Sequence, residues 1–131
     1  MNVNMINATL ATNHINQQRQ ALIDKNYNEI YAHELAHQRA GGSFAGGIVI
    51  ERNAEGIPVG GHVAIQMPTL DKKNPQKTID HANTVIAAAM APADPSPQDY
   101  NVANQASAIK QQAVAIKNNN PHLGKKLDIQ G

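Results

Sequence analysis

Hydrophobic residues recur at steps of three to four between about residue 13 and residue 41, which is the spacing of one face of an α-helix. The residues on this face are Ile23, Tyr27, Ile30 (or Tyr31) and Leu35. Gly41 and Gly42 are predicted to end the helix, because glycine readily adopts the left-handed conformation that closes one. A kink near residues 24–26 would divide it in two. Residues 1–12 show no sustained period and are predicted to form a flexible N-terminal arm.

The pattern changes after the two glycines. Residues 47–51 form a short run with β-branched side chains at its centre. Residues 53–56 have the composition of a turn, and residues 59–67 alternate between apolar and polar side chains. This order predicts a β-hairpin. Its turn places His62 opposite Gly47 or Val49, and both registers leave His62 on the same face because they differ by two residues. The core-facing positions would be Ile48, Ile50, Val59, Val63 and Ile65.

Two further helices are predicted after the hairpin. Asn74 followed by Pro75 is a good N-cap and first-turn pair for the first of them. Ser96 caps the second, with Pro97 at its first position and Asp99 placed to complete an arrangement close to a capping box. Each helix carries an apolar stripe, and the steps of four and three in the second suit close antiparallel packing. The stripes are Ile79, Ala82, Ile86 and Ala89, then Val102, Ala106, Ile109, Ala113 and Ile116.

Together these elements predict a single α+β domain over residues 13–118, followed by a C-terminal tail at residues 119–131. A length of 131 residues allows one such domain. The chain contains 20 alanines but only 31 Val, Ile, Leu, Met and Phe residues, so the core should be thin and its helices closely packed. The chain has no cysteine, which excludes a disulfide scaffold, a Cys-ligated zinc site and a thiol nucleophile.

Charge and hydropathy restrict the partners. Eleven basic and ten acidic residues leave a formal net charge of +1, which argues against nucleic-acid binding. No apolar run approaches the roughly 18 residues of a membrane helix, so no membrane partner is expected. The N-terminus lacks the charged start and apolar stretch of a signal peptide. We therefore expect a cytoplasmic protein, while export by another route would leave no such signal.

Two of the six histidines stand in the segment His33-Glu34-Leu35-Ala36-His37, which matches H-E-x-x-H inside the first predicted helix. A spacing of four residues brings both imidazoles onto one face, where they can bind one Zn²⁺ at about 2.0–2.1 Å each. Glu34 is then expected to act as general base, taking a proton from the attacking water and delivering it to the leaving amine. The alternative interpretation is a surface helix with two solvated histidines.

A catalytic zinc ion needs a third protein ligand, and His62 is the predicted one. It projects from the non-core face of the hairpin, close to the base where the chain leaves the motif helix. Glycines on both strands remove side-chain bulk around it and allow close approach. The alternative is that His62 is a lone exposed strand histidine. His81, beside Asp80, is a rival ligand, whereas His14 and His122 lie in polar terminal regions and should be solvated.

Three blocks of sequence carry a further signal. They are the segment from Tyr31 to Gly47, which contains the H-E-x-x-H motif and AGGSFAGG, then VGGHV at residues 59–63, then AAAMAPADPSPQD at residues 87–99. In this order they resemble the bacterial SprA-related family of zinc metalloproteases, over about residues 28–106. The resemblance implies a minimal zincin-like domain, in which the H-E-x-x-H helix packs with a β-hairpin and two C-terminal helices.

The chain departs from the family pattern at one position. The pattern there is Gly-Glu-Val, and this chain has Gly61-His62-Val63. Glutamate and histidine are both ordinary zinc ligands, so the exchange fits a ligand position. It would convert a two-histidine, one-carboxylate site into a three-histidine site. If His62 is not a ligand, the departure instead puts activity in question.

The sequence therefore predicts a zinc-dependent metallopeptidase. His33, His37 and His62 would bind Zn²⁺, Glu34 would be the general base, and the exposed edge of the hairpin would pair with an extended peptide or protein substrate. Two alternatives stay open. One is a non-enzymatic zinc-binding module that keeps the metal for folding. The other is a helical structural or interaction module in which the histidines are incidental.

Overall fold

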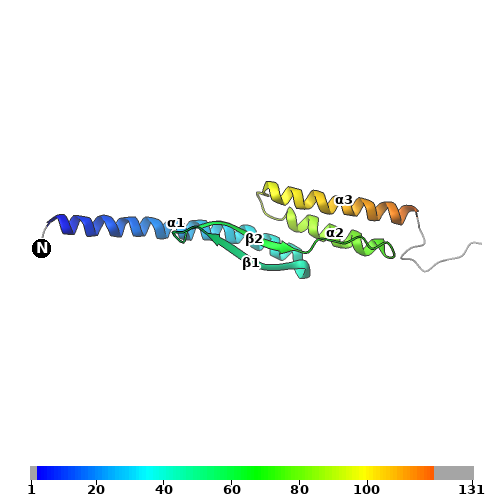
Figure 1. The fold of residues 1–131 in the computed structure, drawn as a ribbon, viewed down its shortest axis with the longest axis horizontal. Coiled ribbons are helices and arrows are strands. Elements are labelled where there is room, and N and C mark those ends of the chain that lie inside the picture. The colour runs from blue at the N-terminus through cyan, green and yellow to red at the C-terminus, as the bar shows by residue number, and fades with distance from the viewer. Residues whose placement is uncertain (1–2, 120–131) are drawn as a thin grey trace, which may run out of the picture.

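The structure, a computed structural model, describes residues 3–119 and has the predicted α+β composition. Its elements are α1 (Val3–Gly41), a short 3-10 turn (Gly42–Phe44), β1 (Ala45–Arg52), β2 (Pro58–Ile65), α2 (Pro75–Ala89) and α3 (Pro97–Asn119). The hairpin of β1 and β2 runs along the C-terminal half of α1, and α2 and α3 lie side by side at the other end of the molecule (Figure 1). The molecule is therefore elongated, with its two halves meeting near the end of α1.

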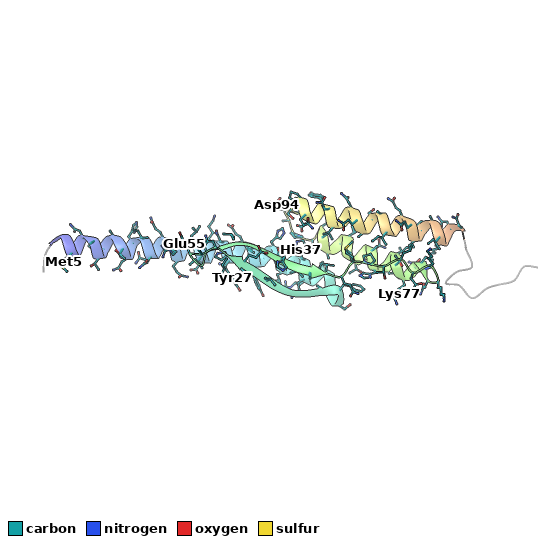
Figure 2. The ribbon with its side chains drawn as sticks, viewed as in Figure 1. Met5, Tyr27, His37, Glu55, Lys77 and Asp94 are labelled. Carbon is teal, nitrogen blue, oxygen red and sulfur yellow. The ribbon has the colours of Figure 1, made fainter. Side chains whose placement is uncertain are left out.

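The first helix is longer and straighter than the sequence pattern predicts. The kink expected near residues 24–26 is corrected, because α1 runs without a break from Val3 over 39 residues, or about 58 Å. Residues 3–12 of the expected N-terminal arm are part of this helix. Residues 5–22 are exposed, and Met5 lies at the far end of this projecting half (Figure 2). Periodicity gives no signal for a helix that buries no face. Extending an existing helix needs no new nucleus, so such a segment can still be helical.

The hairpin forms with each strand end within two residues of its predicted position, and it has one of its two predicted registers. α1 ends at Gly41, and Gly42 adopts the left-handed conformation with a φ of 55°. β1 pairs antiparallel with β2, and His62 lies opposite Val49. His62 is exposed, as expected for the face away from the core, while four expected core positions are half-buried: Ile48, Ile50, Val63 and Ile65.

Val59 is the exception in this face assignment. It was expected toward the core, but it is 62% exposed. The pairing register shifts beside it, because Glu51 pairs with Gly60 while the next residue, Arg52, pairs with Pro58. Val59 is the extra residue of a β-bulge, and a bulge interrupts the alternation of faces along a strand.

The helical pair provides most of the core. The Asn74 side chain accepts a hydrogen bond from the Lys77 N–H at the start of α2, which confirms the predicted N-cap. Small side chains fill the interior and let the helices approach closely, as the thin alanine-rich composition implied. The buried apolar residues are Ile79, Ala82, Val85, Ala88, Ala89, Ala103, Ala106 and Ala113.

Two further expectations concern the ends and surfaces of the chain. The predicted tail at residues 119–131 lies outside the described residues apart from Asn119, which ends α3. Among the helices of residues 3–119, none has the combination of length and apolar character that crossing a membrane requires.

Candidate metal centre

The H-E-x-x-H segment lies in the C-terminal half of α1, where the helix is covered by other elements. His37 and Glu34 are both buried, each 6% exposed, and the His33 side chain is 27% exposed. One potential ligand atom from each of His33, Glu34 and His37 lies within 4.8 Å of the others. The two imidazoles meet edge to face, with their ring centres 4.8 Å apart. The four-residue spacing therefore brings both histidines to one point, as the helical period requires.

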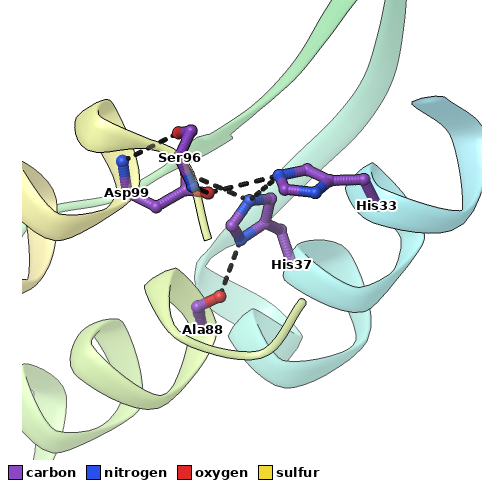
Figure 3. Close-up of polar contacts among 5 residues, drawn as sticks. All are labelled: His33, His37, Ala88, Ser96 and Asp99. Atoms are coloured by element: carbon purple, nitrogen blue, oxygen red, sulfur yellow. Dashed lines mark hydrogen bonds and ion pairs between the residues drawn. The ribbon is translucent and has the colours of Figure 1, made fainter. Parts of the chain in front are cut away.

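Asp99, in the first turn of α3, joins this cluster (Figure 3). Its Oδ2 lies 3.2 Å from His33 Nε2, and its Oδ1 lies 3.1 Å from His37 Nε2. The two Nε2 atoms are 3.2 Å apart. Two imidazole nitrogens and a carboxylate thus converge from helices that are distant in the sequence.

The backbone at the start of α3 holds Asp99 in this position. The Ser96 N–H donates to Asp99 Oδ2 at 2.8 Å, and the Asp99 N–H donates to Ser96 Oγ at 3.1 Å. These reciprocal hydrogen bonds are the predicted capping box. Sequence analysis assigned Asp99 only this capping role. The approach of Asp99 to His33 depends on how α3 packs against α1, and a local sequence pattern does not predict such packing. The one sequence signal for Asp99 was its place in the third of the three sequence blocks.

The hydrogen bond on the far side of His37 determines which atom it offers to the cluster. His37 Nδ1 lies 2.7 Å from the carbonyl oxygen of Ala88 in α2 (Figure 3). A carbonyl can only accept, so Nδ1 carries the proton, and Nε2 of the neutral ring carries a lone pair. That lone pair faces an Asp99 carboxylate oxygen and His33 Nε2. Histidine nitrogens together with a carboxylate oxygen are a ligand set that suits zinc.

The cluster forms part of the wall of a cavity of about 590 Å³. α1 contributes His33, Glu34 and His37, and α3 contributes Asp99 and Val102. β2 contributes four successive residues to the same wall: Gly60, Gly61, His62 and Val63. The cavity is therefore large enough for part of an organic ligand, and it opens beside the cluster.

Glu34 faces this cavity without a polar partner. Its side chain makes no hydrogen bond or ion pair with any residue in the described part of the chain. A carboxylate that is buried among side chains but borders a cavity keeps its lone pairs available to a water molecule there. This is the arrangement that a general base needs.

The structure places His62 apart from the other predicted ligands. Its Nδ1 lies 3.0 Å from Glu51 Oε1, across the hairpin, and its side chain is 57% exposed. It borders the cavity but is outside the group formed by His33, Glu34 and His37. Its assignment as a zinc ligand stays a prediction.

The remaining described histidines are engaged elsewhere. His81 stacks on Phe44, and its Nε2 lies 2.7 Å from the Gln66 carbonyl oxygen, beside a different cavity. His14 is exposed and contacts Gln18 within α1. His122 lies outside the described residues.

Comparison with known proteins agrees with the sequence resemblance. The model of the SprA-related family matches residues 5–119, which is most of the chain. This chain belongs to the SprA-related family. No curated protein and no solved structure matches it.

In this SprA-related protein the three sequence blocks meet at the cluster. The first block supplies His33 and His37, and the third supplies Asp99. The second supplies Gly61, which packs against α1 at Glu34: a Cβ atom at this position would lie 3.1 Å from Glu34 Cγ. The blocks are separate along the chain and contribute residues to the lining of one cavity.

Proposed function

We propose that this protein is a zinc-dependent metallopeptidase with a zincin-like arrangement of its H-E-x-x-H helix. The observation that carries the proposal is the grouping of His33 and His37 with Glu34 beside a cavity, with Glu34 free of hydrogen-bond partners in residues 3–119. A structural helix would not need two imidazoles to converge next to an unpartnered carboxylate.

His33 and His37 would hold the zinc ion through their Nε2 atoms. When bound, zinc lowers the pKa of water held at the site and polarises the carbonyl of the peptide bond. The Ala88 carbonyl fixes the orientation of the His37 ring, as partners of metal-binding histidines commonly do. Glu34 would take the proton from the attacking water and give it to the leaving amine.

The substrate would lie along β2. In the described chain the sheet has two strands, so β2 is paired with β1 along one edge only. Successive residues of β2 border the cavity next to the cluster. An extended peptide that paired with this edge would have its backbone held by main-chain hydrogen bonds, which favours a peptide or protein as the substrate class.

Replacing Glu34→Gln tests the catalytic assignment. We expect the variant to bind one zinc ion per chain, because the two histidines are untouched. We expect its cleavage of a peptide library to fall by about 10²–10⁴-fold, the usual contribution of a general base. Mass spectrometry of the digested library and metal analysis of the same protein give both readouts.

Glu55→Gln is the matched control, because it makes the same charge change at an exposed position in the hairpin turn and does not border the cavity. It should cleave like the wild type. Equal cleavage by Glu34→Gln and wild type would exclude Glu34 as the base. A wild type that binds zinc but cleaves no peptide would instead favour a non-enzymatic zinc-binding module.

A further inference from the structure

The geometry points to Asp99 as the third zinc ligand, and this inference rests on the proposed zinc function. In a tetrahedral zinc site with bonds of about 2.0–2.1 Å, neighbouring ligand atoms are about 3.3 Å apart. His33 Nε2 lies 3.2 Å from Asp99 Oδ2, His37 Nε2 lies 3.1 Å from the other carboxylate oxygen, Oδ1, and the two Nε2 atoms are 3.2 Å apart. One ion can therefore contact all three side chains without rearrangement of the backbone.

The surroundings of Asp99 match those of a metal-binding carboxylate. Such carboxylates are usually held by hydrogen bonds of their own, which fix their orientation. The Ser96 N–H holds Oδ2 of Asp99 at 2.8 Å, and the side chain is 14% exposed. The carboxylate is largely buried, and a divalent cation among the three groups would compensate for its charge.

His62 does not have this placement. Successive side chains of a strand point to opposite faces. The position of Gly61 faces α1, because a Cβ there would lie 2.7 Å from Ile30 Cγ2 and 3.1 Å from Glu34 Cγ. The next residue, His62, therefore points away from the helix that carries His33. The contact of His62 Nδ1 with Glu51 Oε1 agrees with this orientation of the His62 side chain.

The assignment also changes which elements the metal would connect. A site with His62 would join α1 to the hairpin. A site with Asp99 joins α1 to the start of α3, which packs mainly on α2. In the described residues, the contacts of Asp99 with His33 and His37 are polar links between α1 and α3. Zinc would therefore secure the helical pair against α1.

Competition titration with a chromophoric zinc chelator, using Zn²⁺ alone as the probe, tests the assignment in the full chain. Asp99→Asn removes the anionic ligand but keeps an oxygen that can accept the Ser96 N–H, so the capping box should persist. We expect its zinc affinity to fall by at least about a hundredfold, since losing even an outer partner of a ligand costs about 10–100-fold. His62→Ala should bind zinc like the wild type.

Asp94→Asn is the matched control, because it makes the same charge change at an exposed position just before α3. It should keep the wild-type affinity. Wild-type affinity in Asp99→Asn together with loss in His33→Ala would overturn the role of Asp99 and leave the proposed function standing. Loss in His62→Ala instead would identify His62 as the ligand. No zinc binding by the wild type would overturn both proposals.

X-ray absorption spectroscopy of the zinc-loaded wild type tests the same inference without a variant, in case Asp99→Asn does not fold. Imidazole rings give characteristic outer-shell scattering, so the spectrum reports how many histidines bind the ion. We expect the scattering of two imidazoles and an additional oxygen. The scattering of three imidazoles would overturn the assignment.

Discussion

At the scale of single residues, the glycines near the site are not equivalent, although the sequence presents them as similar pairs. A Cβ on Gly61 would lie 2.7 Å from Ile30 Cγ2 and 3.0 Å from the Val49 carbonyl oxygen, whereas a Cβ on Gly47 would meet nothing within 4 Å. Gly61 is therefore required for the close approach of β2 to α1 beside Glu34. Gly47 is not required for any such contact.

This difference predicts opposite outcomes for two equal substitutions. Gly61→Ala should lower the free energy of unfolding by about 1–3 kcal/mol, the usual cost of forcing an extra methyl group into a packed site. Gly47→Ala should change it little. Urea denaturation of both variants measures the effect. If the two variants had the same free energy of unfolding, α1 and β2 could move apart at Gly61 without cost, and the prediction would be wrong.

At the scale of elements, α1 consists of two halves with different sources of stability. The C-terminal half is held by the hairpin and by α2, through contacts such as that of His37 with Ala88. Residues 5–22 are exposed and depend on backbone hydrogen bonds, with the hydroxyls of Thr9 and Thr12 donating to carbonyls four residues earlier. A helix without tertiary packing is only marginally stable in water.

Amide hydrogen exchange should therefore divide α1 in two. We expect amides of residues 5–20 to exchange on the order of a hundredfold faster or more than those of residues 30–40, because local opening costs far less free energy than global unfolding. Amides of residues 79–89 in α2 serve as the protected reference. Comparable protection along the whole of α1 would mean that its projecting half is covered by a partner in solution.

At the scale of the whole molecule, the cluster lies where the two halves meet. Figure 2 shows His37 near the junction of α1 with the helical pair. Most of the buried apolar residues are alanines, whose side chains each bury little apolar area. The contacts at this junction should therefore contribute a large part of the free energy of unfolding. A metal ion bound at the junction would stabilise the folded state by mass action.

Metal removal should consequently destabilise the protein. At a free zinc concentration of one hundred times the dissociation constant, the folded state should gain about 2.7 kcal/mol. A chelator should therefore lower the melting temperature of the wild type. In His33→Ala the chelator should have no effect, and calorimetry of both proteins measures the difference. If neither zinc nor the chelator changed the melting temperature of the wild type, the result would favour a structural module in which the histidines are incidental.

The features that the sequence by itself determined are local ones. Gly41 and Gly42 end α1, Asn74 and Ser96 cap the later helices, and the turn composition limits the hairpin to two registers, one of which occurs. The spacing of His33 and His37 places them on one helix face. Each of these follows from backbone geometry within a few residues, so a single sequence contains enough information for it.

Tertiary structure decided what depends on the docking of one element against another. Asp99 is a helix-capping residue by pattern, and only the position of α3 brings it to His33, 66 residues away. The bulge at Val59, the difference between Gly61 and Gly47, and the exposed helical half of α1 are of the same kind. Local periodicity does not specify the contacts of Asp99, Val59 and Gly61, because they result from packing between separate elements, and it gives no signal for the exposed half of α1, because that half packs on nothing in the described residues.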